Sequence, residues 1–167
     1  MRLGRLPALL VVISVLFSMF SCSNEKAFEY CELGIVLTND FDKYESNGAY
    51  DAAYADGELI VGMTRISFVE SEEFGILTTH TPEKFARVYC DTYVAKGVEI
   101  FQHKDVPYYS YVNKGADGYR YFYMLTFYRT PFSYFIITFI TPEYKLDVQK
   151  EKIFEYIETV YILPQHI

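Results

Sequence analysis

Two long apolar segments in the second half of the chain, residues 119–129 and 134–141, most strongly constrain the fold. Each is long enough for a β-strand, but neither shows the alternation of apolar and polar residues that marks a strand with one wet face. In the second segment both alternating sets of side chains are apolar: Tyr134, Ile136 and Ile140 in one set, Phe135, Ile137 and Phe139 in the other. A sheet built on these strands must therefore be covered on both faces.

Two segments with helical periodicity can supply that cover. Thr81 followed by Pro82 is typical of a helix start, because threonine caps the first N–H groups and proline suits the first helical position. This helix is expected to run to about Lys96 and to stop at Gly97. Its packing face comprises Phe85, Val88, Tyr89 and Thr92, with Cys90 and Val94 beside it. A second helix is expected after Pro142, up to Tyr161, with Pro164 ending it and with an apolar stripe of Leu146, Ile153, Ile157 and Val160.

The other segments predict further strands. Asp56–Gly57 is a strong hairpin signal, so residues 50–55 and 58–69 are expected to pair. Shorter strands are expected at residues 28–31, 35–37, 98–102 and 108–113. The fold class is therefore α+β: a three-layer α/β/α sandwich with a central, mostly antiparallel sheet, one helix on one face, and one helix plus the N-terminal strands on the other.

The N-terminus has the order of an export signal. Arg2 and Arg5 precede the apolar run Leu6–Phe20, and the small residue Ser21 follows. Fifteen residues are short for a membrane-spanning helix, which needs about 20, so residues 1–21 are expected to be a cleaved signal peptide. Cleavage would remove two arginines and no acid, so the net charge would change from −7 to −9.

The residues at the cleavage point resemble the lipobox of bacterial lipoproteins: Met19, Phe20, Ser21 and Cys22. The resemblance implies that Cys22 is lipidated and becomes the new N-terminus, with residues 22–27 as a short tether. The protein would then be extracytoplasmic and anchored to the bacterial cell membrane. If Cys22 is not lipidated, the same signal predicts an ordinary secreted protein.

Two further cysteines, Cys31 and Cys90, have two interpretations. An exported protein can pair them in a disulfide, and two buried thiols acting as small apolar side chains fit equally well. No metal site is expected, since His80, His103 and His166 are scattered singly and are interpreted as surface residues. The acidic cluster Glu70, Glu72 and Glu73 lacks the alternating ligands of a calcium loop, so a solvated loop is expected.

The order of elements resembles the PsbP/Mog-like sandwich. The residues that carry the resemblance are Gly34–Leu37 with Asn39–Phe41, the helix at Thr81–Pro82, and the long hairpin of residues 119–141 leading into the last helix. It covers residues 28–163 as one domain. It implies a fold whose members bind protein partners and are not enzymes as a rule, and it carries no functional residue over to this chain.

The sequence gives function less directly than fold. The net charge of −7 argues against nucleic acid, and no catalytic motif or cofactor-binding motif is found. A run of tyrosines is the candidate binding surface, because tyrosine combines an apolar body with a polar tip: Tyr108, Tyr109, Tyr111, Tyr119 and Tyr121. The alternative is that these rings only cover the sheet.

We therefore expect a lipid-anchored binding module without catalysis and without a cofactor. Its partner would be an envelope protein or a small ligand, engaged through the tyrosine-rich sheet edge and its loops. Two alternatives stay open. One is an envelope enzyme whose active site is assembled from distant residues, and the other is a structural surface protein that self-associates through its aromatic strand edge.

Overall fold

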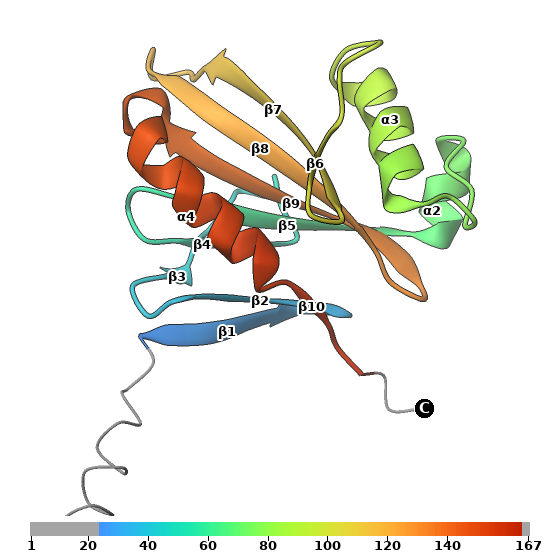
Figure 1. Ribbon diagram of the computed structural model, residues 1–167, viewed down its shortest axis with the longest axis horizontal. Coiled ribbons are helices and arrows are strands. Elements are labelled where there is room, and N and C mark those ends of the chain that lie inside the picture. The colour runs from blue at the N-terminus through green and yellow to red at the C-terminus, as the bar shows by residue number, and fades with distance from the viewer. Residues whose placement is uncertain (1–23, 165–167) are drawn as a thin grey trace, which may run out of the picture.

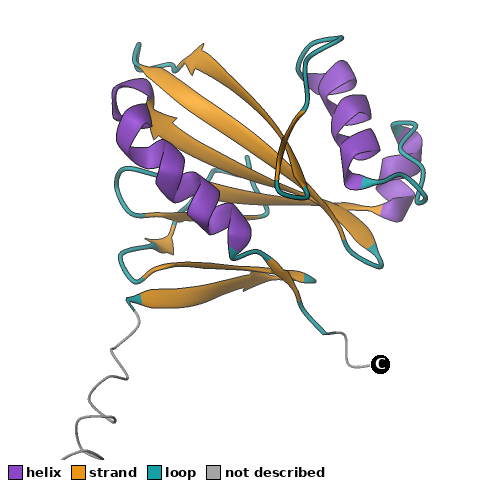
Figure 2. Ribbon diagram, viewed as in Figure 1, coloured by secondary structure: helices purple, strands orange, loops and turns teal. Residues whose placement is uncertain are grey.

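The computed structural model describes residues 24–164, and these build two antiparallel sheets and several helices (Figures 1 and 2). Within these residues the larger sheet has the strand order β3-β4-β5-β9-β8-β7-β6. Its strands are β3 (Asp42–Lys43), β4 (Ala52–Ala55), β5 (Ile60–Ser67), β6 (Phe101–His103), β7 (Val106–Lys114), β8 (Arg120–Arg129) and β9 (Ser133–Pro142). The smaller sheet has the order β1-β2-β10, with β1 (Glu25–Tyr30), β2 (Leu33–Thr38) and β10 (Tyr161–Ile162). The helices are α2 (Phe68–Glu73), α3 (Pro82–Tyr93), the 3-10 turn η1 (Glu143–Lys145) and α4 (Leu146–Glu158).

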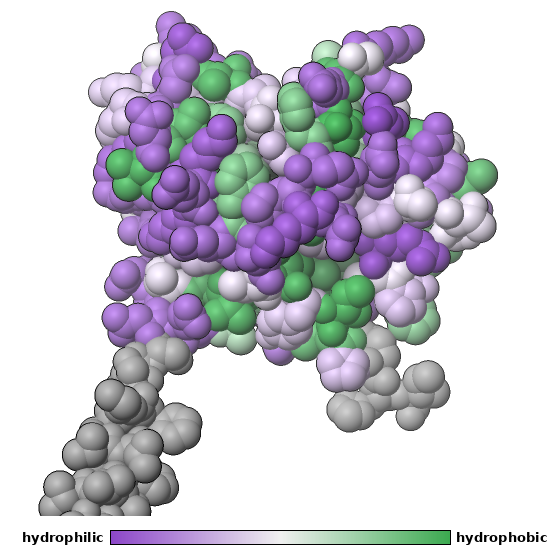
Figure 3. Space-filling model, in the orientation of Figure 1, coloured by the Kyte–Doolittle hydropathy of each residue, from purple (hydrophilic) through white to green (hydrophobic). Residues whose placement is uncertain are grey.

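One face of the larger sheet packs against α4 and the smaller sheet. Figure 1 shows α4 lying across this face, with β1, β2 and β10 beside it, and Figure 3 shows this side of the molecule as a mostly hydrophilic surface. The smaller sheet, α4 and the larger sheet all contribute buried residues here. They are Leu33, Ile35 and Leu37 from β2, Ile153 and Ile157 from α4, and Val61, Met63, Ile137 and Phe139 from the larger sheet. These side chains form the main hydrophobic core.

The opposite face packs against α2, α3 and the loops that join them. Phe85 of α3 contacts two rings of the sheet, stacking on Tyr134 at 4.5 Å and meeting Phe127 edge-on at 5.5 Å between ring centroids. Cys90 is fully buried in the same cluster. Both faces of β8 and β9 are thus covered, as their two-sided apolar pattern predicted.

Several predicted elements are confirmed and others end at different residues. The helix after Thr81 is confirmed, because the Thr81 hydroxyl accepts a hydrogen bond from the Lys84 N–H at 3.2 Å and proline occupies the first turn. It ends at Tyr93 rather than Lys96. The hairpin at Asp56–Gly57 is confirmed as β4 and β5, with Gly57 at a φ of 89°.

The acidic segment after β5 is a helix, so the prediction of a loop is wrong. Ser67 and Glu70 form a capping box: the Ser67 hydroxyl accepts from the Glu70 N–H at 3.2 Å, and the Glu70 carboxylate accepts from the Ser67 N–H at 2.8 Å. Such reciprocal bonds satisfy two N–H groups that a helix start leaves free. These bonds outweigh the repulsion among the glutamates and start α2.

The closing helix is shorter than predicted and is followed by a strand. It ends at Glu158, because the Thr159 hydroxyl turns to β2, where it accepts from the Val36 N–H at 3.1 Å and donates to the Val36 carbonyl at 2.9 Å. Tyr161, the last residue of the predicted helix, instead pairs with β2 together with Ile162.

The N-terminal hairpin also differs from the prediction. Its turn is at Cys31 and Glu32, with Cys31 at a φ of 51°, whereas Gly34 lies inside β2. β1 begins at Glu25, so the folded domain starts before the predicted residue 28 and takes in part of the predicted tether 22–27. Residues 1–21 and Cys22 lie outside the described residues.

An ion pair joins the two sheets. Glu32 is only 7% exposed, and its carboxylate accepts two hydrogen bonds from the Arg65 guanidinium, both at 3.0 Å. The Ser133 hydroxyl donates a third bond to it at 3.3 Å. Burial by itself would raise the pKa of Glu32, but the hydrogen bonds and charge of Arg65 prevail and hold that pKa below its usual value.

We expect Arg65→Met to lower the free energy of unfolding at neutral pH by about 2 kcal/mol. Breaking a buried pair commonly costs about 3–5 kcal/mol, and this one is weaker because the Arg65 side chain is 31% exposed. The pair stabilises the protein above the ordinary carboxyl pKa, and this contribution is lost as the pH falls through the lowered pKa of Glu32. Urea unfolding at several pH values should therefore show the two proteins converging in acid.

A matched control is Arg87→Met, which removes an exposed i,i+4 pair with Glu83. It should cost less than about 0.5 kcal/mol. An Arg65→Met penalty as small as this, or one independent of pH, would contradict the assigned role.

Gly34 makes room for the ring of Tyr161, which lies opposite it in the β2–β10 pair. A Cβ atom at position 34 would come within 2.4 Å of that ring. We expect Gly34→Ala to lower the free energy of unfolding by about 2 kcal/mol through this clash. In a Tyr161→Ala background the same change should cost far less, because the ring is gone. A double-mutant cycle by urea unfolding measures the coupling, and equal costs in both backgrounds would rule the clash out.

Candidate functional site

The predicted tyrosine surface is divided between the two faces of the sheet. Tyr108 lies on the α4 side, where it packs against Phe154 at 5.6 Å between ring centroids. Tyr109 and Tyr111 pack on the α3 side. Neighbouring residues of a strand point to opposite faces, so Tyr108 and Tyr109 cannot share one surface.

Tyr119 and Tyr121 lie at the far end of β7 and β8. Tyr119 is 66% exposed next to the turn, and the Tyr121 hydroxyl donates to Asp117 at 2.6 Å. This bond raises the pKa of Tyr121 and lowers that of Asp117. The five tyrosines therefore do not form a single surface, and their role in binding stays a prediction.

Three tyrosines do form one structure, which we name the tyrosine stack: Tyr109, Tyr111 and Tyr123. The rings of Tyr109 and Tyr111 are 5.7 Å apart, and those of Tyr111 and Tyr123 are 4.9 Å apart and almost parallel, at 5°. Burial, helped by neighbouring Tyr123, raises the pKa of Tyr111. The stack presents apolar rings with polar tips.

Tyr50 adds to this aromatic region and was not among the predicted site residues. Its ring lies over Gly62, where a Cβ atom would come within 2.5 Å of it. Burial and the neighbouring Tyr123 and Tyr111 raise the pKa of Tyr50 to about 12. The sequence carried one signal for it, since a glycine inside a strand often marks a close approach by another group.

The tyrosine stack lies beside an open strand edge. β6 pairs only with residues 106–108 of β7, so no described strand pairs with the outer edge of residues 109–114. Val112, which points to the other face, is 37% exposed. Figure 1 shows β7 at the border of the larger sheet, on the side away from β1.

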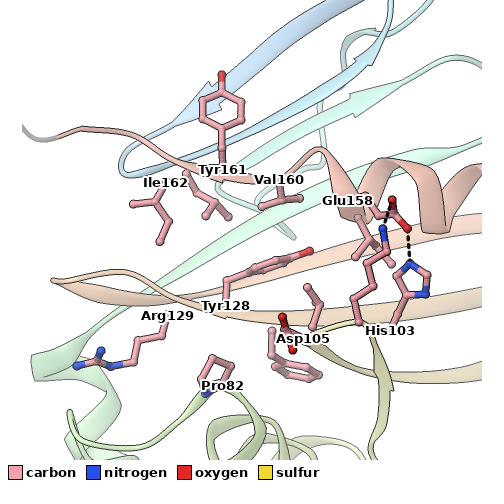
Figure 4. Close-up of a pocket in the computed structure, with 14 residues that line it drawn as sticks. Pro82, His103, Asp105, Tyr128, Arg129, Glu158, Val160, Tyr161 and Ile162 are labelled. Carbon is pink, nitrogen blue, oxygen red and sulfur yellow. Dashed lines mark hydrogen bonds and ion pairs between the residues drawn. The ribbon is translucent and has the colours of Figure 1, made fainter.

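A separate cleft of about 590 Å³ lies between the end of α4, β10, the β6–β7 turn and the start of α3 (Figure 4). Its walls are mainly apolar: Leu33, Pro82, Val106, Phe127, Ile157, Val160 and Ile162. The sequence gave no sign of this cleft, because its lining comes from segments that lie far apart in the chain. Its size is typical of a site for a small molecule.

Charged side chains also line the cleft, and some of them are already paired. The Glu158 carboxylate contacts Lys104 at 2.5 Å and His103 at 2.9 Å, and these two partners lower its pKa. His103 also stacks on Phe154, at 4.4 Å between ring centroids. It is therefore part of a contact network rather than an isolated surface histidine. Figure 4 draws both contacts of Glu158 as dashed lines.

Two more charges line the cleft. Arg129 points away from its centre in Figure 4 and donates two hydrogen bonds to the Thr78 carbonyl, at 3.0 and 3.2 Å. Asp105, in the β6–β7 turn, has no ion pair or side-chain hydrogen bond with any described residue. Figure 4 shows its carboxylate within the cleft, with Tyr128 on one side and Pro82 on the other.

Tyr128 contributes its ring to the cleft, and its hydroxyl is buried without a hydrogen-bond partner among residues 24–164. Burial raises the pKa of Tyr128 far above its usual value, and the neighbouring Thr126 hydroxyl offsets only part of this. The Thr126 hydroxyl already donates to the Ile137 carbonyl at 3.1 Å. Tyr128 is thus a neutral aromatic surface at any physiological pH.

The two remaining cysteines are free thiols in very different places. Cys31 is exposed in the β1–β2 turn, and Cys90 is buried in α3. Neither interpretation from the sequence is therefore fully correct. Cys31 and Cys90 form no disulfide, and only Cys90 is buried. Within residues 24–164 no group of three His, Cys, Asp or Glu side chains could hold a metal ion, and no helix is long and apolar enough to span a membrane.

Comparison with known proteins identifies the fold but no family. No protein-family model matches the chain, and no curated protein matches it. A crystal structure from Bacteroides thetaiotaomicron VPI-5482 has a TM-score of 0.57 at 12% identity, covering 85% of this chain and 50% of that one. The chain therefore spans about half the length of that structure, and at this identity the likeness shows the fold alone.

The solution structure of cyanobacterial PsbP (CyanoP) from Synechocystis sp. PCC 6803 is also similar. It has a TM-score of 0.48 at 9% identity, and the alignment covers 86% of this chain and 95% of that one. A likeness this weak supports no conclusion about this chain. What the described residues show is a mixed α/β fold with two antiparallel sheets, shared in outline with the Bacteroides structure.

Proposed function

We propose that this chain is an exported, lipid-anchored binding module that engages a partner protein of the cell envelope through the open edge of β7. One observation carries the proposal. The outer edge of residues 109–114 is unpaired with any described strand, and it lies beside the tyrosine stack.

An unpaired strand edge offers a row of backbone N–H and C=O groups. Proteins usually protect such edges with proline, lysine or a covering segment, because any extended chain can pair with them. Here the proline of the strand, Pro107, lies in the part already paired with β6, and Lys114 stands at the far end. Residues 109–113 between them carry neither proline nor lysine, so the open edge is unprotected beside the tyrosine stack.

An extended segment of a partner would find different surfaces on its two sides. On the α3 side, its side chains would contact Tyr109 and Tyr111. On the other side, they would contact the exposed Val112 and Phe101. Backbone pairing would give affinity, and these alternating contacts would give specificity. Tyrosine is well suited to this, since its large ring loses little conformational freedom on binding.

The lipid anchor is the second part of the proposal. Cys22, two residues before the first described residue, would carry the lipid, as the resemblance of Met19–Cys22 to a lipobox implies. β1 begins at Glu25, so the tether would be only a few residues long and would hold the domain close to the membrane. β7 lies on the opposite side of the molecule from β1 in Figure 1, so its edge would face away from the lipid.

We take the larger sheet, with α4 and the smaller sheet on one face and α2 and α3 on the other, to be an α/β/α sandwich of the PsbP/Mog type. The order of elements along the chain supports this. The resemblance implies a protein partner rather than a substrate.

A photo-crosslinking residue, p-benzoylphenylalanine, tests the edge directly. Placed at Val112, it should crosslink to one discrete protein when the chain is incubated with envelope extract from the producing bacterium. Placed at Val148, which is 76% exposed on α4, it should not. Changing Tyr109 and Tyr111 to serine should reduce the Val112 crosslink severalfold, because the aromatic contacts would be lost.

The matched control for this variant is Tyr119→Ser, an exposed tyrosine outside the tyrosine stack, which should leave the crosslink unchanged. Thermal unfolding of each variant checks that the fold is kept. Equal crosslinking from both positions, or none from Val112, would overturn the edge site. A product of twice the chain's own mass would show self-association instead of a partner.

Intact mass measurement of the chain expressed in a bacterium tests the anchor. We expect a membrane-bound species that begins at Cys22 and carries added diacylglycerol. Cys22→Ser should lose this modification, because the thiol is the group that takes the lipid. A soluble, unmodified wild-type chain would show that Cys22 is not lipidated and that the protein is secreted.

A further inference from the structure

The cleft at the end of α4 points to a second activity, independent of the β7 edge. We propose that it binds a small organic cation, an amine with an apolar body, whose charged group is held by Asp105. The lining of the cleft, the pairing of its charges and the placement of the Tyr128 ring carry this inference.

The first step is the balance of charge. Glu158 is neutralised by the Lys104 ammonium and also bonds to His103, so this network leaves no free negative charge and keeps Lys104 occupied. The Arg129 guanidinium forms no ion pair with a described residue, but it is turned outward to the Thr78 carbonyl. Asp105 is then the unpaired charge whose side chain points into the cleft, and it is negative.

The second step concerns the helix ends. The C-terminal end of α4 forms one wall of the cleft, where Glu158 lines it. The last carbonyl groups of a helix carry partial negative charge, which favours a cation within about one turn. The start of α3, at Pro82, has partial positive charge, but the first-turn residue Glu83 and the cap at Thr81 offset it. The C-terminal end of α4 therefore adds to the preference for a cation that Asp105 creates.

The third step is the nature of the surface around the carboxylate. Tyr128 lines the cleft beside apolar residues of α4 and β10, whereas Phe127 borders it but is only 1% exposed. The Tyr128 ring can attract a cation through the negative charge of its face, and the apolar walls favour a ligand with a hydrophobic body. An anion would instead meet Asp105, while the unpaired cation Arg129 is directed away from the cleft.

The test uses three probes of nearly equal shape and different charge: 2-phenylethylammonium, 2-phenylethanol and 3-phenylpropionate. Each probe is titrated into the full mature chain labelled with ¹⁵N, and binding is followed by the amide chemical shifts. The cation should shift the amides of Asp105, Val106 and Val160. It should bind about tenfold more tightly than the alcohol, the ratio expected for one charge-assisted hydrogen bond, and the anion should bind most weakly.

Asp105→Asn should abolish the preference for the cation and leave binding of the alcohol unchanged. The matched control is Asp40→Asn, an exposed aspartate of the β2–β3 turn that lies outside the cleft, which should keep the preference. Equal binding of the three probes, a preference that survives Asp105→Asn, shifts confined to residues outside the cleft, or no binding by any probe up to its solubility would each overturn the proposal.

Discussion

Burial of the central strands on both faces is the constraint on which the rest of the structure depends. Seven consecutive residues of β9, from Ser133 to Phe139, are buried, although neighbouring residues of a strand point in opposite directions. Each face therefore needs its own cover. Covering it stabilises the folded state by about 25 cal/mol for each Å² of apolar surface removed from water. The amphipathic helices α3 and α4 supply it on opposite sides, and the smaller sheet completes the α4 side.

The same burial explains how polar groups are arranged within the sheet. A buried hydroxyl is costly unless it is bonded, and most of them here bond to backbone carbonyls. The Tyr134 hydroxyl reaches two carbonyls of the loop before α3, those of Leu77 and His80, at 2.7 and 2.9 Å, and so fixes that loop to the sheet. The pair of Glu32 and Arg65 does the same between the two sheets. The β7 edge and the cleft at the end of α4, to which we assign function, lie at the borders of the packed sheet.

The candidate site was only partly predictable. The tyrosines of β7 and β8 were identified from composition, but strand alternation sends Tyr108 to one face and Tyr109 to the other. That alternation was already present in the sequence and could have divided the set. The open edge could not be predicted, because it depends on how few residues of β6 pair with β7. The cleft was beyond prediction, since Leu33 and Ile162 meet His103 and Phe127 only after folding.

The sequence by itself determined the elements whose signals are local. Two-sided apolar strands, the cap at Thr81 with its proline, and the turn at Asp56–Gly57 each act within a few residues, and all three are confirmed. The tertiary structure decided what depends on distant partners. α4 ends where Thr159 binds β2, Tyr161 forms a strand because Gly34 leaves room for its ring, and Lys104 pairs with Glu158 of a distant helix. Such outcomes are set by competition among residues more than 50 positions apart, which no local pattern records.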